Sequence, residues 1–369
     1  MRIICTQENL NKGLGIASHI ASRNVTLPIL NNVLIKASDG MIKLMATNLE
    51  MGISAVIRGK VESEGEFTIQ ARLIAEYINL LPRENVELSL EGDNLNIKCG
   101  NYKTFIKGMA AGDFPLIPEI EKNNEVIMDA GDFKKAISQV MFAVTLDEAR
   151  PEISGIYFSF SGKTLTMVGT DSYRLAEKKV NLKNGATEDK NIIVPLKTVQ
   201  EVYRILSDDV GNEISLFVND NQILFRFNGE VELISRLIEG QYPDYQQILP
   251  ENSKTQAKVN VNDFMRVIKS ASLFCKPGIN DVKLAISGDK KSVIVASLNS
   301  SVGENVVNVE AEITGEDNEA VFNFRYLLDG LNNLDTADVS LELISGNAPG
   351  VLKSAGDNSY LYVIMPIRQ

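Results

Sequence analysis

Three stretches of this chain open in the same way, and that repetition constrains the fold more than any other feature. Each begins with a short alternating strand, passes an acidic or amide residue and continues into an amphipathic helix. Leu10, Phe133 and Phe264 occupy matching positions in these helices, which gives a period of roughly 125 residues. A unit of that length can enclose its own core, so the repetition predicts three domains of one architecture.

The rest of each unit also repeats. Hairpins are expected over 31–47, 152–170 and 280–298, with turn signals at Asp39-Gly40, Ser161-Gly162 and Gly288-Asp289. A second strand then leads into helices over 71–81, 196–206 and 323–334, and alternating strands follow. The pattern is six copies of a strand–helix–three-strand motif. It predicts an α+β fold with three homologous domains over 1–119, 120–248 and 249–369, separated by the proline-bearing segments 112–118 and 240–245.

The distribution of charge adds a functional hint. The chain has 37 basic and 48 acidic residues, a net charge of −11, which argues against a wholly basic nucleic-acid binder. The six expected helices nevertheless carry more basic than acidic residues. If the helices lined the inside of an arc, two copies would bring twelve of them around an opening of roughly 28 Å, wide enough for a DNA duplex. Cationic helices there would bind phosphates without reading bases.

Enzymatic chemistry has little support in the sequence. The single histidine, His19, falls off the apolar face of the first expected helix and is predicted to face solvent. Gly13 and Gly15 form a partial GxGxxG pattern that lies inside this helix instead of after a strand. Acidic residues at 208–209, 316–317 and 171 lie in loops without an assignable partner. We therefore expect a protein that is not an enzyme, with no catalytic residues.

The cysteines and the hydropathy pattern bear on compartment and cofactors. Cys5, Cys99 and Cys275 lie far apart and form no CxxC pair. They are interpreted as reduced thiols of a cytoplasmic protein, without a disulfide framework or a zinc site. We see no export signal at the N-terminus and no apolar stretch long enough for a membrane span, so no membrane partner is expected. No metal or cofactor is expected either.

Six motifs, in order along the chain, carry a resemblance. They are TLPIL at 26–30, NLEM at 48–51, GDFP at 112–115, TDSYRLA at 170–176, GQYPDYQQILP at 240–250 and VIMPIR at 363–368. Through them the sequence resembles the bacterial DNA polymerase III beta subunit family, the sliding clamps, over its full length.

The resemblance implies a DNA clamp fold, with sheets outside and helices lining a ring-shaped homodimer. Such a ring would encircle duplex DNA without sequence preference and act as a processivity factor in DNA replication. Its partners would be the DNA polymerase III catalytic subunit, an ATP-driven clamp loader, and other proteins carrying the clamp-binding motif, such as translesion polymerases, mismatch repair proteins and ligase. The alternative is a repeat-built protein-interaction scaffold that does not encircle DNA.

The resemblance also implies a pocket between the second and third domains for a partner's short motif containing Gln and Leu or Phe. An apolar cleft with a few polar groups suits such anchors. Tyr173 and Gln247 stand where the family commonly has His and Arg, which could alter the preferred peptides. The pocket positions are Ile153, Thr170, Ser172, Tyr173, Arg174, Leu175, Pro243, Gln247, Ile248, Ile279, Asn323, Tyr326, Val363, Met365, Pro366, Ile367 and Arg368.

Two further surfaces follow from the charge pattern and the resemblance together. For the subunit interface, the family packs an edge strand of the first domain against the third domain, and the matching positions here are Ile106, Leu273 and Phe274. The surface facing DNA is assigned to basic residues of the helices and loops, namely Arg23, Arg72, Lys134, Lys135, Arg150, Lys197, Arg204, Arg266 and Lys269.

Overall fold

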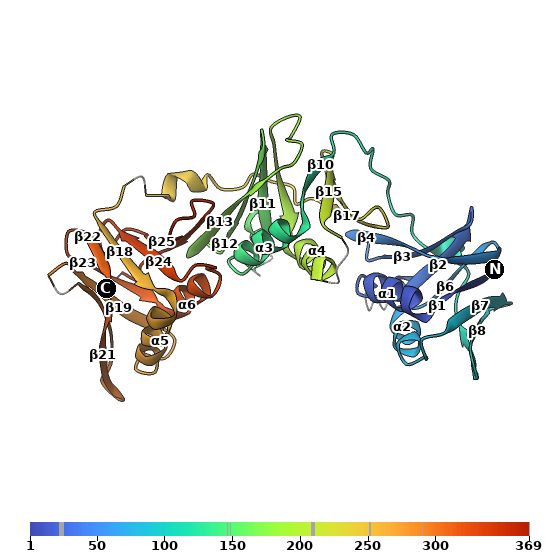
Figure 1. Cartoon of the computed structure of the whole chain (residues 1–369), viewed down its shortest axis with the longest axis horizontal. Helices are drawn as coiled ribbons and strands as arrows, with labels where there is room; N and C mark the ends of the chain where they lie inside the picture. Colours follow the sequence, from blue (N-terminus) through green and yellow to red (C-terminus); the bar gives the residue numbers. More distant parts are fainter. Residues whose placement is uncertain are drawn as a thin grey trace. The chain divides into compact units, whose positions relative to one another are not determined.

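The computed structural model of the chain describes residues 1–21, 26–145, 147, 149–207, 211–250, 252–289 and 291–368. Its internal contacts divide the chain into two compact units (Figure 1). The first consists of Met1–Gly131 and Glu201–Leu237, and the second of Asp132–Gln200 and Ile238–Gln369. Each unit therefore combines one end of the chain with part of the expected central domain.

The first unit contains two antiparallel sheets. The five-stranded sheet has the order β5 (Gly59–Ser63), β1 (Arg2–Thr6), β7 (Asn85–Glu91), β8 (Asn94–Cys99) and β9 (Tyr102–Lys107). The eight-stranded sheet has the order β10 (Val126–Asp129), β15 (Glu213–Val218), β16 (Gln222–Phe227), β17 (Val231–Arg236), β4 (Met51–Ile57), β3 (Met41–Thr47), β2 (Asn32–Ser38) and β6 (Gly65–Gln70). The pairing of β17 with β4 joins the central segment to the N-terminal segment.

Helices α1 (Gln7–Ala17) and α2 (Ala71–Asn79) lie side by side in this unit (Figure 1). The Thr6 hydroxyl caps α1 by accepting a hydrogen bond from the backbone N–H of Asn9, at 3.3 Å. Gly13 lies in the middle of α1, where a Cβ would lie 2.5 Å from Cγ2 of Ile57. This glycine serves close packing of the helix on the sheet.

The second unit also contains two antiparallel sheets. The nine-stranded sheet has the order β14 (Lys190–Pro195), β11 (Gly155–Ser161), β12 (Thr164–Thr170), β13 (Arg174–Asn181), β26 (Tyr360–Ile364), β25 (Gly350–Ser354), β24 (Asp338–Leu343), β18 (Thr255–Asn260) and β22 (Glu312–Gly315). The four-stranded sheet has the order β21 (Gly303–Glu310), β20 (Ser292–Asn299), β19 (Asp281–Ser287) and β23 (Asn318–Asn323).

Helices α5 (Val261–Ser272) and α6 (Phe324–Asn332) pack against each other in the second unit (Figure 1). Both are capped by asparagine side chains, Asn260 and Asn323, that accept backbone N–H groups of the first turn. Phe264, Ile268 and Ala271 of α5 are fully buried, which confirms the predicted apolar face. Helices α3 (Ala130–Met141) and α4 (Leu196–Ser207) complete the six expected helices.

The element order confirms the six predicted copies of the strand–helix–three-strand motif, to which β5 and β22 are short additions. The three hairpins also form where expected, as β2–β3, β11–β12 and β19–β20. One prediction needs correction. Helix α1 ends at Ala17, so the exposed His19 lies in the turn after the helix and not on it. Ser18 caps the helix, and its backbone N–H donates to the carbonyl oxygen of Leu14.

Candidate functional site

The joint between β13 and β26 in the second unit gathers much of the predicted pocket. Leu175 pairs with Val363 across this joint, and Arg174 pairs with Ile364. Beyond β26, the backbone N–H of Met365 donates to the carbonyl oxygen of Tyr173 at 2.8 Å. The backbone N–H of Ile367 donates to the carbonyl of Val321 at 2.7 Å. Residues 365–367 are therefore fixed by backbone hydrogen bonds to the turn before β13 and to β23.

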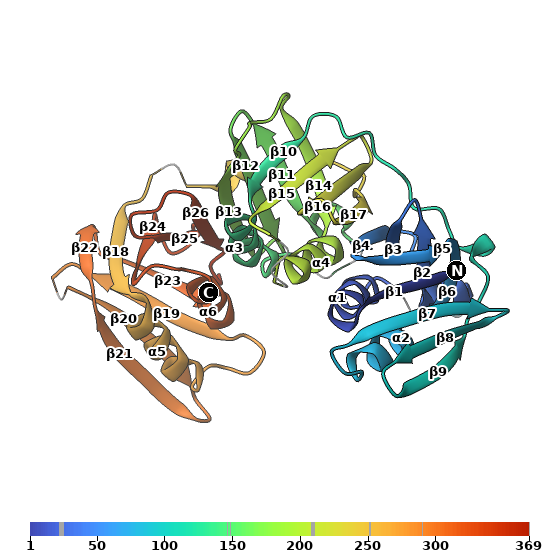
Figure 2. The same cartoon turned by 45° about the vertical axis from the view of Figure 1, so that its right-hand side comes forward.

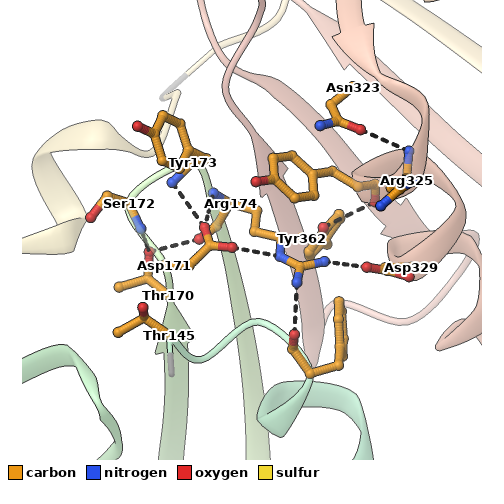
Figure 3. A network of polar contacts seen from close by, with 12 residues as sticks. Thr145, Thr170, Asp171, Ser172, Tyr173, Arg174, Asn323, Arg325, Asp329 and Tyr362 are labelled. Atoms are coloured by element: carbon orange, nitrogen blue, oxygen red, sulfur yellow. Dashed lines mark hydrogen bonds and ion pairs between the residues drawn. The ribbon is translucent and has the colours of Figure 1, made fainter. Parts of the chain in front are cut away.

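A tight turn precedes β13 and sets the direction of Tyr173. The Thr170 hydroxyl donates to the carbonyl oxygen of Arg174 at 2.6 Å and accepts the backbone N–H of Ser172 at 3.1 Å. Oδ1 of Asp171 accepts the N–H groups of Tyr173 and Arg174, at 2.9 and 3.0 Å. Ser172 has a φ of 79°, in the left-handed region. This turn leaves the Tyr173 ring 63% exposed at the rim of the joint (Figure 3).

The Arg174 side chain lies in a network of the protein's own groups (Figure 3). Its guanidinium forms ion pairs with Asp171, at 2.9 Å, and with Asp329, and donates to the carbonyl oxygen of Phe142 at 3.0 Å. It also stacks over the Tyr326 ring, 4.7 Å from the centroid. Burial by itself lowers the pKa of Arg174. The surrounding groups, Asp329 and Asp171 among them, outweigh this effect and raise the pKa above its ordinary value. This residue braces the joint.

The segment between β17 and β18 is fastened to the same sheet by two tyrosines. The Tyr242 hydroxyl donates to the carbonyl oxygen of Val168 at 3.3 Å, and the Tyr245 hydroxyl donates to Glu177 at 2.7 Å. Both rings share an apolar cluster with predicted pocket residues Ile153, Leu175 and Val363. Since those three side chains are almost fully buried, they support the surface from beneath.

The remaining predicted pocket positions differ in what they offer to a ligand. Thr170 is buried in the turn, the Asn323 side chain caps α6, and Gln247 donates to Asp244 at 2.8 Å. Arg368 is exposed. The accessible apolar or aromatic side chains are Tyr173, Pro243, Ile248 and Ile279, with Tyr326, Met365, Pro366 and Ile367 half-buried.

Most of the basic residues predicted to face DNA have carboxylate partners nearby. Arg72 pairs with Glu76 on α2 at 2.7 Å, and Lys135 with Asp335 at 2.8 Å, and in both cases the partner raises the pKa of the basic group. Arg266 likewise pairs with Asp263, and Arg150 pairs with Glu152 and donates to Ser172. The side chains of Lys197 and Lys269 are exposed, and that of Lys134 is half-buried. Arg23 lies outside the described residues.

Arg204 differs from this group. Its guanidinium pairs with Glu201 at 2.8 Å and donates to the carbonyl oxygen of Ile16 in α1 at 3.0 Å. The side chain is 24% exposed. Arg204 therefore ties α4 to the C-terminal end of α1, where the free carbonyl groups favour a cation.

The residues predicted for a subunit interface lie on the edge strand β9 and directly after α5, which packs against the edge strand β21. Strand β9 ends the five-stranded sheet and β21 ends the four-stranded sheet (Figure 2). Leu273, just after α5, is 75% exposed and Phe274 is half-buried, whereas Ile106 on β9 is only 9% exposed and packs into its own sheet. Sequence reasoning missed the exposed apolar side chains at these edges, which are Tyr102, Phe105, Val302 and Val306.

The described part of the chain offers few groups for other chemistry. No group of three or more His, Cys, Asp or Glu side chains there could hold a metal ion. None of the described helices is long and apolar enough to cross a membrane. The acidic pair expected at 208–209 lies outside the described residues, and Asp171 is occupied by its own turn and by Arg174.

Comparisons with known proteins converge on one family. Models of the DNA polymerase III beta subunit match in order, with the N-terminal domain over residues 1–118, the central domain over 128–244 and the C-terminal domain over 246–368. The beta sliding clamp of Staphylococcus epidermidis is 32% identical over 357 residues, 94% of each chain. The beta sliding clamp of Synechocystis is 27% identical over 391 residues, covering 100% of this chain and 99% of the relative.

Solved structures agree with these sequence matches. The DNA polymerase sliding clamp of Bacillus subtilis has a TM-score of 0.94 at 28% identity, with 100% of this chain and 99% of that chain covered. The DNA polymerase III beta subunit of Thermotoga maritima has a TM-score of 0.93 at 27% identity, over the same shares.

Proposed function

The chain belongs to the DNA polymerase III beta subunit family, and from that premise we propose that it is a DNA sliding clamp, a homodimeric ring that encircles duplex DNA and tethers the replicative polymerase. The observation that carries this proposal is the match of three family models in tandem along nearly the whole chain. The proposed domains are 1–119, 120–248 and 249–369. The role of a processivity factor needs no catalysis, and we place it in the cytoplasm with the replication apparatus.

We assign the docking of partner proteins to the joint between β13 and β26. Tyr173, Ile248 and Ile279 offer exposed apolar or aromatic surface. The base beneath them is rigid, because Arg174 braces the turn and because Tyr242 and Tyr245 hold the preceding segment. A preformed site of this kind binds a short peptide without a large ordering cost. The expected partners are the polymerase catalytic subunit, a clamp loader and other proteins with a short Gln- and Leu/Phe-containing motif.

Peptide binding tests this assignment directly. A fluorescein-labelled peptide Gln-Leu-Asp-Leu-Phe, measured by fluorescence anisotropy, should lose at least about tenfold in affinity when residues 365–368 are deleted. The same loss is expected for Ile248→Asp, because a carboxylate would then face the apolar anchor. Leu116→Asp is the matched control, since Leu116 is 96% exposed and lies outside the joint. Unchanged affinity in both pocket variants would contradict the assignment.

Assembly as a head-to-tail dimer is supported by two of the sheet edges in the described part of the chain. Strand β9 ends a sheet in the first unit and β21 ends a sheet in the second. An exposed edge presents free backbone N–H and C=O groups that a second chain can pair. Leu273 and Phe105 would supply apolar contact beside this pairing, since they are 75% and 57% exposed. Head-to-tail pairing of two such chains closes a ring.

The DNA-facing surface is proposed to be electrostatic and independent of sequence. Lys197 and Lys269 are exposed on α4 and α5, and Arg72 and Lys135 are exposed near carboxylates. Ion pairs of this kind are weak in water and can exchange for phosphate contacts. A repeat-built scaffold that never encircles DNA is the competing proposal. It predicts no dependence of retention on DNA topology.

A further inference from the structure

A groove on the eight-stranded sheet of the first unit is separate from the β13–β26 joint, which belongs to the second unit. It has a volume of about 530 Å³. Met45 of β3, Ser54 of β4, and Leu224 and Ile234 of β16 and β17 line it from the sheet. Residues 117–120, together with Lys122, line it from the connecting segment that follows the first domain. The sheet side of the groove therefore combines the apolar side chains of Met45, Leu224 and Ile234 with charged side chains of the neighbouring strands, which are Lys36, Lys43 and Glu232.

The internal repeat places this groove beside a counterpart of the proposed peptide site. Strand β4 pairs with β17 much as β13 pairs with β26. The turn before β4 has the same hydrogen bonds, since the Thr47 hydroxyl donates to the carbonyl of Met51 at 2.9 Å and accepts the N–H of Leu49 at 3.1 Å. Asn48 accepts two backbone N–H groups, as Asp171 does, and Leu49 has a φ of 76°.

The residue at one matching position of the two joints differs, and this difference shapes the groove. Where β13 has Leu175 beside Val363, β4 has Gly52 beside Ile234. A Cβ added to Gly52 would lie 2.8 Å from Cγ2 of Ile117, so the connecting segment packs its own side chain onto this glycine. The open space consequently lies along the sheet, past Ile117, towards β3 and β2.

Three lysines (Lys36, Lys43 and Lys122) and two glutamates (Glu119 and Glu232) line the groove, so its net charge is positive and favours an anionic group near the lysines. Lys36 of β2 and Lys43 of β3 lie directly opposite each other in the antiparallel register. Like charges in this position are destabilising. Lys36 has a half-exposed partner, Glu66, at 3.6 Å. Within the described part of the chain, Lys43 forms no ion pair. An external carboxylate near Lys43 would therefore relieve the repulsion, whereas Lys122 is already paired with Glu232 at 2.6 Å.

We propose that this groove is a second docking site, which binds a short peptide segment of a partner protein that carries an apolar side chain next to a carboxylate. The apolar side chain would rest on Met45, Ile120 and Ile234, and the carboxylate would pair with Lys43. This site is independent of the β13–β26 joint. With both sites filled, one protomer would hold two motifs, which raises the effective concentration of a bivalent partner.

Photo-crosslinking of the full-length dimer tests the proposal. The probe is the peptide Gln-Leu-Asp-Leu-Phe with an N-terminal benzophenone, and crosslinked residues are mapped by mass spectrometry. Crosslinks are expected within 43–54 or 117–122, in addition to those at the β13–β26 joint. Lys43→Glu should lower the yield at the groove by about tenfold, because it removes a charge-assisted contact, and should leave the yield at the joint unchanged.

Two controls make the result specific to the groove. Lys43→Arg should retain the crosslink, and a Gln-Leu-Lys-Leu-Phe probe should restore it with Lys43→Glu. No crosslink within 43–54 or 117–122 in the unmodified protein, or a yield there that Lys43→Glu leaves unchanged, would overturn the second site. Absence of crosslinks at the β13–β26 joint in the unmodified protein, with those at the groove present, would instead count against the proposed function. Failure of the second site and failure of the proposed function are therefore distinguishable.

Discussion

Arg174 on β13 and Asp329 on α6 form an ion pair across the joint that underlies the proposed peptide site. The same guanidinium binds Asp171 and the carbonyl oxygen of Phe142, so one side chain connects a turn, the end of α3 and a helix of the C-terminal segment. Its side chain is only 13% exposed. Such a cation is held by its partners, and its removal leaves carboxylates without their counter-charge.

Arg174→Ala should lower the free energy of unfolding by about 2 kcal/mol, less than for a fully buried pair because the Asp329 side chain is 45% exposed. Arg325→Ala is the matched control. Arg325 is exposed, and its guanidinium lies 5.9 Å from the Phe324 ring centroid, so a change within about 0.5 kcal/mol is expected. Urea unfolding of both variants measures the difference. Equal losses of unfolding free energy in the two variants would show that the contacts of Arg174 do not stabilise the joint.

Leu273→Asp should dissociate the proposed dimer. An exposed leucine that becomes buried between subunits contributes about 2 kcal/mol or more, and a carboxylate in its place adds a desolvation cost. The dissociation constant should therefore rise at least about a hundredfold. Sedimentation velocity at several concentrations measures it, with Leu116→Asp as the control. A variant that stays dimeric at the same concentrations as the control would place the interface elsewhere.

Reversing the charge of helix lysines predicted to face DNA should weaken the salt dependence of direct DNA binding. Each phosphate contact adds about 0.9 to the slope of log affinity against log salt. The triple change of Lys134, Lys197 and Lys269 to Glu should reduce that slope by about 3 if all three contact phosphates. Anisotropy of a labelled duplex at several NaCl concentrations measures the slope. Reversal of Lys98, Lys163 and Lys254, which are exposed outside the helices, should leave it unchanged.

Burial raises the pKa of the Cys5 thiol to about 12. The folded protein thus favours the neutral thiol, while the unfolded chain ionises from about pH 8.5. The contribution of Cys5 to stability is fully present below that pH and is lost as the pH rises towards 12. Cys5→Val should therefore flatten the decline in unfolding free energy between pH 8.5 and 10.5, measured in urea. An unchanged pH profile would contradict this assignment.

The repeat made much of the architecture predictable. Alternating strands and the 3.6-residue pattern around Phe264 depend on local sequence, so the hairpins and helices form where expected. The joints were not predictable, because the pairings of β17 with β4 and of β13 with β26 connect segments far apart in the chain. The same holds for Arg204, whose contact with Ile16 depends on how α4 meets α1.

The candidate site was predictable only in part. The motifs pointed to Tyr173, Leu175 and Val363, and the structure places Leu175 opposite Val363. Nothing in the sequence pattern identified Asp329 as the partner of Arg174, because that pair is separated by 155 positions. The burial of Ile106 on β9 also depends on the face that the strand presents, which a one-residue shift in register would reverse.

Retention on circular and linear DNA distinguishes a ring that encloses the duplex from a protein that binds its surface. The protein is placed on a nicked circular duplex by its cognate clamp loader, the circle is then linearised with a restriction enzyme, and bound protein is followed by gel filtration. Retention on the circle and loss after linearisation are expected, because a ring that holds DNA by enclosure slides off free ends. Equal retention on both forms would mean that the protein binds DNA by contact, and would contradict the sliding-clamp proposal.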